Sequence, residues 1–476
     1  MMLFTSYPFL VFLPLVAGLY WLMRRWYKGQ NLLLFVASYT FYAWWDWRFL
    51  FLIFGSSLLD FWLARAMGQS ESPQRMRFFL YLSLALNLGV LVYFKYANFF
   101  LENLARLFSA WGLPPVLEDG PLSIILPLGI SFYTFQTLGY TIDVYRYKLK
   151  PSRNFLEYIT FVSFFPQLVA GPIERAGNLL PQFLTKRSWQ KAHLTEGLRQ
   201  MLWGFFKKLA IADALAPQVN YVFAHHEELN GLSLALGALL FTFQMYCDFS
   251  GYSDIAIGTA RLFGFRLMKN FDFPFYSSSM SEFWRRWHIS LSTWIQDYLY
   301  NPLAINRRYW GIWGVAFALL VAFTLSGLWH GAAWTFVLWG GLHGMVLAYE
   351  ALSKKKRKRW SRQFGVTYLW ASRILVFCFW VFTLTIFRAQ DLPQARSVLS
   401  GSLSRSWGDG AAIPLSALLL PLALLVFEYF QRHRAHGLVL KAYPYPLRWS
   451  LYALLLILIF ESDNLNRQTE FIYFQF

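Results

Sequence analysis

The sequence predicts an all-α polytopic membrane protein, and its composition, its apolar segments and the placement of its basic residues all point to this fold class. Apolar residues make up 57% of the 476 residues, and charged residues make up only 14%. Soluble proteins average roughly half apolar and about a quarter charged residues. The apolar residues gather into segments of membrane-spanning length, and lysines and arginines gather between these segments.

A membrane-spanning helix needs about 20 mostly apolar residues, and segments of this kind recur along the whole chain. Candidate spans lie near residues 6–23, 31–45, 48–65, 78–100, 122–145, 198–222, 232–260, 312–329, 332–350, 370–387, 411–429 and 447–460. Several are short or broken, so we expect about eleven or twelve spanning helices, together with re-entrant and amphipathic helices. No internal repeat is apparent, and we expect a single domain over residues 1–476.

The basic residues predict how the chain crosses the membrane. Clusters at residues 24–28, 65–77, 146–153 and 354–359 fall in every second connection, and loops that face the cytoplasm are enriched in lysine and arginine. We therefore expect the N-terminus to face outward. The formal net charge of +18 would by itself also suit nucleic-acid binding, but its confinement to short loops favours a role in topology and excludes nucleic acid as the expected partner.

The stretch 155–183 breaks this alternation. It carries Pro166, Pro172 and Pro181 between two basic connections, and proline interrupts helices. Broken backbone at membrane depth survives only where protein or a water-filled cavity satisfies its polar groups. Two interpretations stay open: a re-entrant segment beside an internal chamber, or a loop at the membrane interface.

Residues 270–308 carry too many charges for a span but still show helical order. From Trp284 onward, apolar residues recur at steps of three and four, the pattern of an amphipathic helix. The stripe consists of Trp284, Trp287, Leu291, Trp294, Ile295 and Tyr298. His288 lies on this stripe, so its imidazole is expected to point into the protein.

His330 is the main candidate for chemistry. Apolar sequence flanks it on both sides, and an ionisable residue at membrane depth is a functional hypothesis by default. Gly327, Gly331 and Ala332 are small enough to let another molecule approach the ring. The alternative is a hydrogen-bonded histidine of the core. Acyl transfer to a hydroxyl requires a base that works near neutral pH, and histidine suits that task.

Other residues are expected to complete the site. His288 is a second catalytic candidate, which would orient the acyl donor or hydrogen-bond a developing oxyanion, unless it only ties its helix to its neighbours. His343 is expected to be a packing group. The residues expected to bind substrate are Trp287, Trp329, Trp334, Asp248 and Ser326.

Two carboxylates, Asp248 and Asp254, lie within an apolar stretch. Carboxylates this deep generally have partners, and we expect Arg285, Arg286 or a histidine to pair with them. A structural ion pair is thus an alternative to substrate binding for Asp248. The sequence contains neither a Gly-rich phosphate loop nor a Gly-x-Ser-x-Gly elbow, and it has no ligand spacing that predicts a metal site.

Four runs, in this order and spacing, resemble the membrane-bound O-acyltransferase (MBOAT) family. They are residues 169–173 (VAGPI), 246–254 (YCDFSGYSD), 283–291 (FWRRWHISL) and 327–331 (GLWHG). The resemblance implies many tilted helices around a central tunnel and an essential histidine in the Trp-His-Gly motif, here His330. The second histidine, His288, stands where many eukaryotic relatives carry asparagine.

The similarity is strongest to the bacterial branch that O-acetylates alginate, and it implies a function. The chain would take acetyl groups from a cytoplasmic donor, acetyl-CoA, without a tightly bound cofactor. It would pass them across the inner membrane to a periplasmic partner protein that acetylates the exopolysaccharide. Other acceptors stay open: peptidoglycan, cellulose, teichoic acid or a lipid. A different class also stays open, a transporter that relays protons through His288, His330, Asp248 and Asp254, although transporters commonly show paired repeats.

Overall fold

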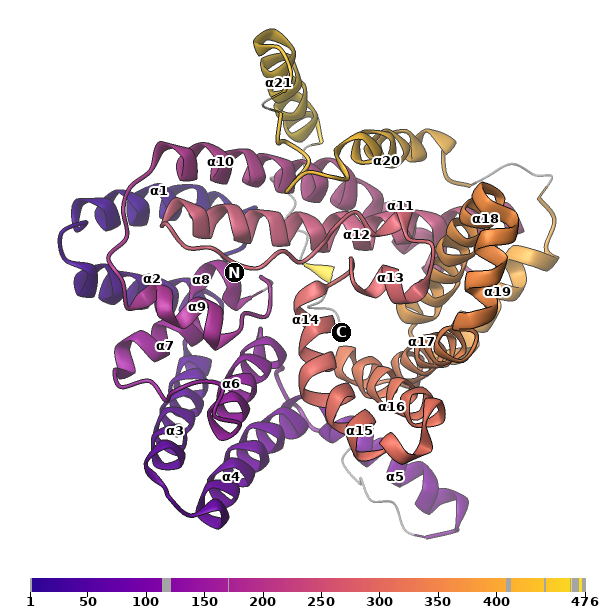
Figure 1. Ribbon diagram of the computed structural model, residues 1–476. Helices are drawn as coiled ribbons and strands as arrows, with labels where there is room; N and C mark the ends of the chain where they lie inside the picture. The colour runs from indigo at the N-terminus through magenta and orange to yellow at the C-terminus, as the bar shows by residue number, and fades with distance from the viewer. Residues whose placement is uncertain are drawn as a thin grey trace. The chain divides into compact units, whose positions relative to one another are not determined.

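The computed structural model describes residues 2–113, 121–169, 171–407, 412–440, 442–462, 464 and 471–472. Within these ranges, helices are the only regular elements (Figure 1). The predicted all-α class is confirmed.

The chain packs into two compact units. The first comprises Met1–Met2, Phe12–Trp189 and Gly331–Ala333, and the second comprises Leu3–Val11, Gln190–His330 and Trp334–Phe476. The single domain expected from the sequence stays a prediction.

Nine α-helices are described up to residue 189, and α1 is divided between the two units. They are α1 (Tyr7–Leu22), α2 (Tyr27–Asp46), α3 (Leu50–Gln69), α4 (Pro73–Leu91), α5 (Ala97–Ala110), α6 (Ile130–Tyr145), α7 (Phe155–Ser163), α8 (Phe165–Leu168) and α9 (Ala176–Phe183). A buried carboxylate joins α3 to α4, because Asp60 accepts hydrogen bonds from Ser83 Oγ at 2.6 Å and from Asn87 Nδ2 at 2.9 Å. Such bonds hold apolar helices together where water is absent.

The second unit contains the long helix α12 (Gly231–Leu262), which is buried along most of its length. The others are α10 (Lys191–Phe205), α11 (Asp213–Ala224), α13 (Met280–Trp284), α14 (Ile289–Ile295), α15 (Asn301–Asn306), α16 (Ile312–His330), α17 (Trp334–Leu352), α18 (Lys354–Arg388), α19 (Leu392–Ser404), α20 (Leu419–Gln431) and α21 (Tyr445–Glu461). Helices α10, α11, α18 and α19 all pack against α12.

Several helices are long and apolar enough to cross a bilayer. Among the described residues, five stretches qualify by length and composition: Tyr27–Gln69, Pro73–Ala110, Gly231–Leu262, Ile312–His330 and Lys354–Arg388. Tyr7–Leu22 and Leu415–Gln431 are shorter apolar helices. The chain is therefore a multi-pass membrane protein. The expected number of eleven or twelve spans stays a prediction, since some apolar segments are divided into shorter helices.

Two segments depart from uniform spanning helices. The span expected at 122–145 is helical only from Ile130, because Pro127 has no N–H to donate and Gly129 adopts the left-handed region at φ +70°. The break expected in 155–183 is confirmed, since this stretch forms the three short helices α7, α8 and α9. Its position in the membrane stays a prediction, and Ala170 of the VAGPI run lies outside the described residues.

Candidate functional site

His330 is the last residue of α16, and only 3% of it is exposed. Three aromatic rings surround the imidazole, with centroid distances of 4.9 Å to Trp329, 5.1 Å to Trp339 and 5.5 Å to Phe387. These rings come from α16, α17 and α18. The imidazole therefore lies in an aromatic environment from which bulk water is excluded.

The tight packing of α16 on α17 fixes this histidine in place. A Cβ atom on Gly327 would come within 2.2 Å of the Phe336 carbonyl oxygen, and one on Gly340 would come within 2.3 Å of the Phe323 carbonyl oxygen. Small residues allow such backbone contact between membrane helices. The open space that the sequence suggests beside Gly327 is therefore filled by α17.

Trp339, which the sequence did not single out, contacts His330 from α17. The substrate-binding role expected of Trp334 stays a prediction. Trp334 begins α17 with 52% of its surface exposed, whereas Trp339 is 2% exposed and packs on the imidazole. Trp334 is the first residue of α17, and its side chain points outward. The first tryptophan on the inward face of the helix is Trp339, about one turn later. Trp329 lies in the interior as expected, and Ser326 is buried one turn before His330.

The amphipathic segment around His288 is buried as predicted, but it does not form the single continuous helix that the sequence pattern predicts. Helix α13 ends at Trp284 and α14 begins at Ile289, and His288 between them has φ 43° and ψ 53°. The break occurs because the Ile289 N–H donates to the backbone oxygen of Asn270 at 2.9 Å instead of continuing the helix. His288 itself is 1% exposed.

Asn270 holds the His288 ring in one orientation. Its side-chain oxygen lies 3.1 Å from His288 Nδ1 and accepts from the Ser290 hydroxyl at 2.9 Å and the Ser290 N–H at 3.3 Å. Its amide nitrogen donates to Ser253 Oγ at 3.1 Å. A backbone N–H can only donate, so the atom it meets must be the amide oxygen.

This network decides the tautomer of His288. An amide oxygen only accepts, so Nδ1 carries the ring proton of the neutral imidazole and Nε2 carries a lone pair. The Ser290 hydroxyl is also 3.4 Å from Nδ1, but its single proton is directed to the nearer Asn270 oxygen. Burial lowers the pKa of His288, which lies outside the spanning helices, to about 3. The ring is therefore neutral at physiological pH.

His288 and His330 both approach Trp329. The His288 ring lies 6.4 Å from that indole and the His330 ring lies 4.9 Å from it. The structure thus brings together three residues that the sequence singled out separately. His343 is fully buried and is held by Trp284 Nε1, at 3.4 Å from its Nδ1, and by Thr383 Oγ1, at 3.2 Å from its Nε2. It has the packing role that the sequence predicts.

The carboxylates of α12 pair with lysines rather than with arginines or a histidine. A π-helical turn, Phe206–Ala212, follows α10 and buries the two consecutive side chains of Lys207 and Lys208. Lys208 Nζ lies 2.6 Å from Asp248 and 2.8 Å from Asp213, and Lys207 Nζ lies 2.6 Å from Asp254. Asp248, expected to bind substrate, is therefore committed to a buried ion pair. Arg286, which the sequence suggested as a partner for these carboxylates, pairs with Glu282 instead.

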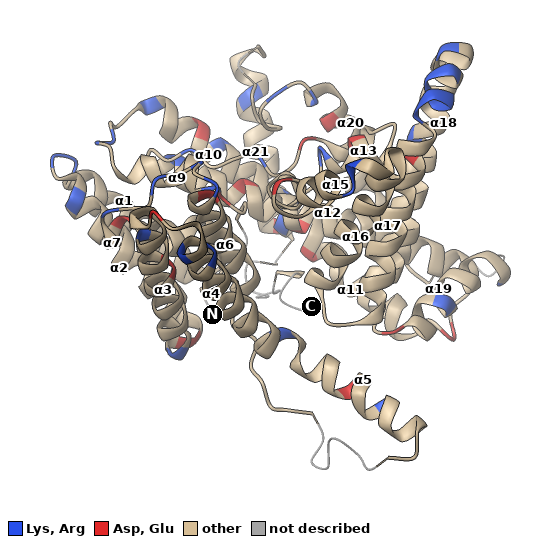
Figure 2. Cartoon of the chain, turned by 60° about the horizontal axis from the view of Figure 1, so that its bottom comes forward, with Lys and Arg blue, Asp and Glu red and all other residues tan. Residues whose placement is uncertain are grey.

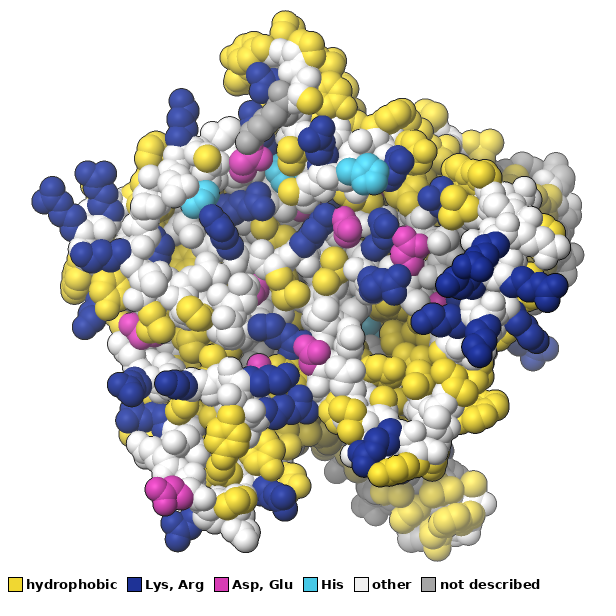
Figure 3. All heavy atoms as spheres, viewed as in Figure 1, with side chains coloured by type: hydrophobic (Ala, Val, Ile, Leu, Met, Phe, Trp, Pro, Cys, Tyr) yellow, Lys and Arg dark blue, Asp and Glu magenta, His cyan; other side chains and the backbone are white. Residues whose placement is uncertain are grey.

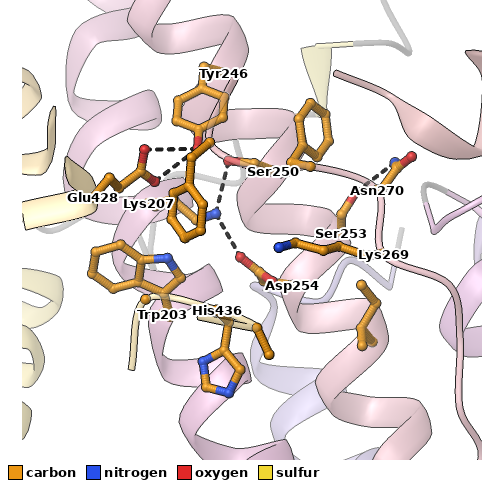
Figure 4. Close-up of a pocket in the computed structure, with 15 residues that line it drawn as sticks. Trp203, Lys207, Tyr246, Ser250, Ser253, Asp254, Lys269, Asn270, Glu428 and His436 are labelled. Carbon is orange, nitrogen blue, oxygen red and sulfur yellow. Dashed lines mark hydrogen bonds and ion pairs between the residues drawn. The ribbon is translucent and has the colours of Figure 1, made fainter. Parts of the chain in front are cut away.

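A small polar pocket adjoins this network (Figure 4). Its labelled side chains include Lys207, which donates to Ser250 Oγ at 2.9 Å, and Glu428 of α20, which accepts from Tyr246 Oη at 2.8 Å. Asn270 also lines the pocket. The residue that orients His288 therefore also lines this pocket.

Phe471 and Ile472 contact residues of α12 near His288. The Phe471 ring is 5.5 Å from Phe249, whose own ring meets the His288 imidazole at 4.6 Å in an edge-on arrangement. The Ile472 N–H donates to Asp248 Oδ2 at 3.0 Å. Trp287 lies in the neighbouring aromatic cluster, 4.7 Å from Trp380. Neither Asn270 nor Phe471 stands out in the sequence, because their partners come from other parts of the chain.

Comparisons with known proteins identify the family of this chain. The model of the membrane-bound O-acyltransferase family, MBOAT, matches residues 148–389, a range that includes His288 and His330. A relative from Pseudomonas putida, "Probable alginate O-acetylase AlgI", is 41% identical over 439 residues, which cover 90% of this chain and 86% of the relative.

Two further relatives carry different names. "Peptidoglycan O-acetyltransferase" from Helicobacter pylori is 33% identical over 425 residues, which cover 83% of this chain and 78% of the relative. "Teichoic acid D-alanyltransferase" from Streptococcus thermophilus is 29% identical over 255 residues, 50% of this chain and 60% of the relative. With a family model that matches half of its length and relatives similar along most of it, this chain belongs to the membrane-bound O-acyltransferase family.

Proposed function

We propose that this chain takes acetyl groups from acetyl-CoA on the cytoplasmic side of a bacterial inner membrane and passes them outward, where a periplasmic partner protein O-acetylates alginate or a related exopolysaccharide. The observation that carries the chemistry is the burial of His330 in an aromatic environment that it shares with His288 through Trp329. Membership of an acyltransferase family makes the chain an enzyme, so the proton-relay transporter is set aside.

Alginate is favoured as the final acceptor by the names of the relatives. The relative named for alginate is more similar to this chain than the relative named for peptidoglycan, and both match most of its length. Cellulose, teichoic acid and lipid acceptors have weaker support.

His330 is the base in this proposal. Its neutral imidazole removes the proton from an acceptor hydroxyl, and the oxygen attacks the carbonyl carbon of the acetyl thioester. The carbon–sulfur bond then breaks, and the imidazolium returns the proton to the departing thiolate. A neutral histidine is suited to both proton transfers near pH 7.

His288 acts as an acceptor of a hydrogen bond. With its proton on Nδ1 and directed to Asn270, the neutral ring offers only a lone pair at Nε2. It is therefore suited to hold the hydroxyl or a thiol of a substrate, and it is poorly suited to donate to an oxyanion. The geometry thus favours the orienting role over oxyanion stabilisation.

The proposed function is tested by acetyl transfer from a labelled donor. Purified full-length protein in proteoliposomes is given radiolabelled acetyl-CoA on one side, with alginate and the partner on the other. Label is expected on the partner or the polymer only with all components present. Acetyl analysis of polymers from cells that lack the protein provides the matching control. Loss of acetyl groups from peptidoglycan, with alginate unchanged, would contradict the proposed acceptor.

Asn270 supplies a test of the orienting role of His288. Asn270→Leu removes the oxygen that holds Nδ1–H, and we expect acetyl transfer to fall roughly tenfold to a hundredfold, as for one lost buried hydrogen bond. Asn270→Asp keeps the acceptor and should retain more activity. The added carboxylate favours the imidazolium and raises the pKa of His288. Because protonation removes the lone pair at Nε2, activity is lost as pH falls through this raised pKa.

The measurement is the pH profile of labelled transfer for both variants and wild type. The acidic limb of the Asn270→Asp profile is expected at higher pH than that of wild type. An unchanged profile, with all rates reduced alike, would show that Asn270 only supports the fold.

A further inference from the structure

Helix α18 joins a strongly basic segment to an apolar one. Residues 354–359 are six consecutive lysines and arginines, and all are exposed except Arg357, which is half-buried. The helix bends at Gly365, where φ is +51° and ψ is −122°. Figure 2 shows the basic residues gathered at one end of α18, and in Figure 3 dark blue side chains gather in this region beside hydrophobic ones.

An apolar groove runs between α17 and α18 next to this basic segment. It holds about 390 Å³ of open space, within the range of roughly 300–1,000 Å³ typical of ligand pockets. Its main apolar lining is Val346, Tyr349, Trp360, Leu375, Val376 and Phe379. Tyr349 and Leu375 are exposed, so the groove opens to the surroundings of the helices.

Glu350 is the one carboxylate among the described residues that line the groove, and its negative charge is already paired. It accepts hydrogen bonds from the N–H groups of Met280 at 2.8 Å and Ser281 at 2.9 Å, and it forms an ion pair with Arg357 at 3.3 Å. A guanidinium has five donors, so the ion pair leaves Arg357 able to bind a further anion. The mouth of the groove is thus cationic, and its floor is apolar.

We propose that this groove is a binding site for an anionic phospholipid. One acyl chain lies in the groove, and the phosphate lies on the basic cluster of residues 354–359. Basic clusters that adjoin a spanning helix attract anionic lipid headgroups, and tyrosine and tryptophan are common at the level of the headgroups. A nucleotide is disfavoured as the occupant, because a ribose and a base need several polar partners and most of the exposed lining is apolar.

Binding of palmitoyl-oleoyl phosphatidylglycerol to the purified full-length protein in detergent tests the proposal. Thermal unfolding is followed as lipid is added, because a ligand of the folded state raises its stability. Val376→Trp fills the groove and is expected to weaken binding about tenfold. Replacing Lys354, Lys355 and Lys358 with glutamine is expected to weaken it by about fivefold for each charge removed.

The matched control is Ile374→Trp, an exposed position on the same helix that does not line the groove. This variant should bind phosphatidylglycerol like wild type, and phosphatidylcholine should bind more weakly to all proteins. Each variant must first show an unchanged melting temperature without added lipid; if Val376→Trp does not, Leu375→Asn replaces it. Equal affinity of the groove variant and Ile374→Trp would overturn the proposal. Stronger stabilisation by glycerol phosphate or coenzyme A than by the lipid would also overturn it.

Discussion

His330→Ala is expected to abolish measurable acetylation of the polymer while leaving a folded protein in the membrane. The imidazole is the proposed base, and removal of a positioned general base costs roughly 10²–10⁴ in rate. The rings of Trp329, Trp339 and Phe387 that contact it cannot take up a proton near pH 7 in its place. The loss should therefore appear at every acetyl-CoA concentration. Acetyl content of the polymer and labelled transfer in proteoliposomes both measure it.

His330→Gln is the companion that separates chemistry from packing. Glutamine is closer to histidine in size than alanine but is not a base, so it should be equally inactive while filling more of the space. His343→Gln is the matched control in the same aromatic cluster, since an amide can still accept from Trp284 and donate to Thr383. We expect that control to keep its activity. Full acetylation by His330→Ala would refute the role given to His330.

The sequence was informative wherever one local pattern decides the outcome. Long apolar segments interrupted by charged connections predicted an all-α membrane protein, because a chain in lipid must satisfy its backbone internally. The stripe from Trp284 to Ile295 predicted burial of one face, and that face is buried. Burying an ionisable side chain in an apolar segment costs free energy, and this cost likewise pointed to His330 as a functional residue. These features need only neighbouring residues to be understood.

The sequence was less informative wherever distant residues decide. The helix break at His288 depends on Asn270, whose backbone and side chain replace the bonds of a continuous helix. The partners of Asp248 and Asp254 are consecutive lysines that an α-helix would point about 100° apart. Both are buried in a π-helical turn, and periodicity based on 3.6 residues does not foresee a turn of this kind. Trp339 rather than Trp334 faces the interior because of where α17 begins.

Lys208→Met is expected to cause the largest loss of stability among single substitutions in the charged network. Lys208 Nζ lies between Asp213 and Asp248, and all three side chains are at most 4% exposed. Loss of the ammonium leaves two carboxylates facing each other without compensation in the interior. Breaking a buried ion pair from one side costs about 3–5 kcal/mol. Lower yield and a lower melting temperature of the purified protein should follow.

The cost arises from the charges left behind, and a rescue experiment makes that explicit. Adding Asp213→Asn and Asp248→Asn to Lys208→Met removes both stranded carboxylates, and replacing a whole buried pair is often neutral. The triple variant should therefore be more stable than Lys208→Met alone, and the amide oxygen at position 248 can still accept from the Ile472 N–H. Lys269→Met is the exposed counterpart: its pair with Asp272 has both side chains more than a third exposed, and such pairs contribute about 0–1 kcal/mol. If the triple variant is no more stable than Lys208→Met, packing of the lysine stem rather than its charge holds the π-helical turn against α12.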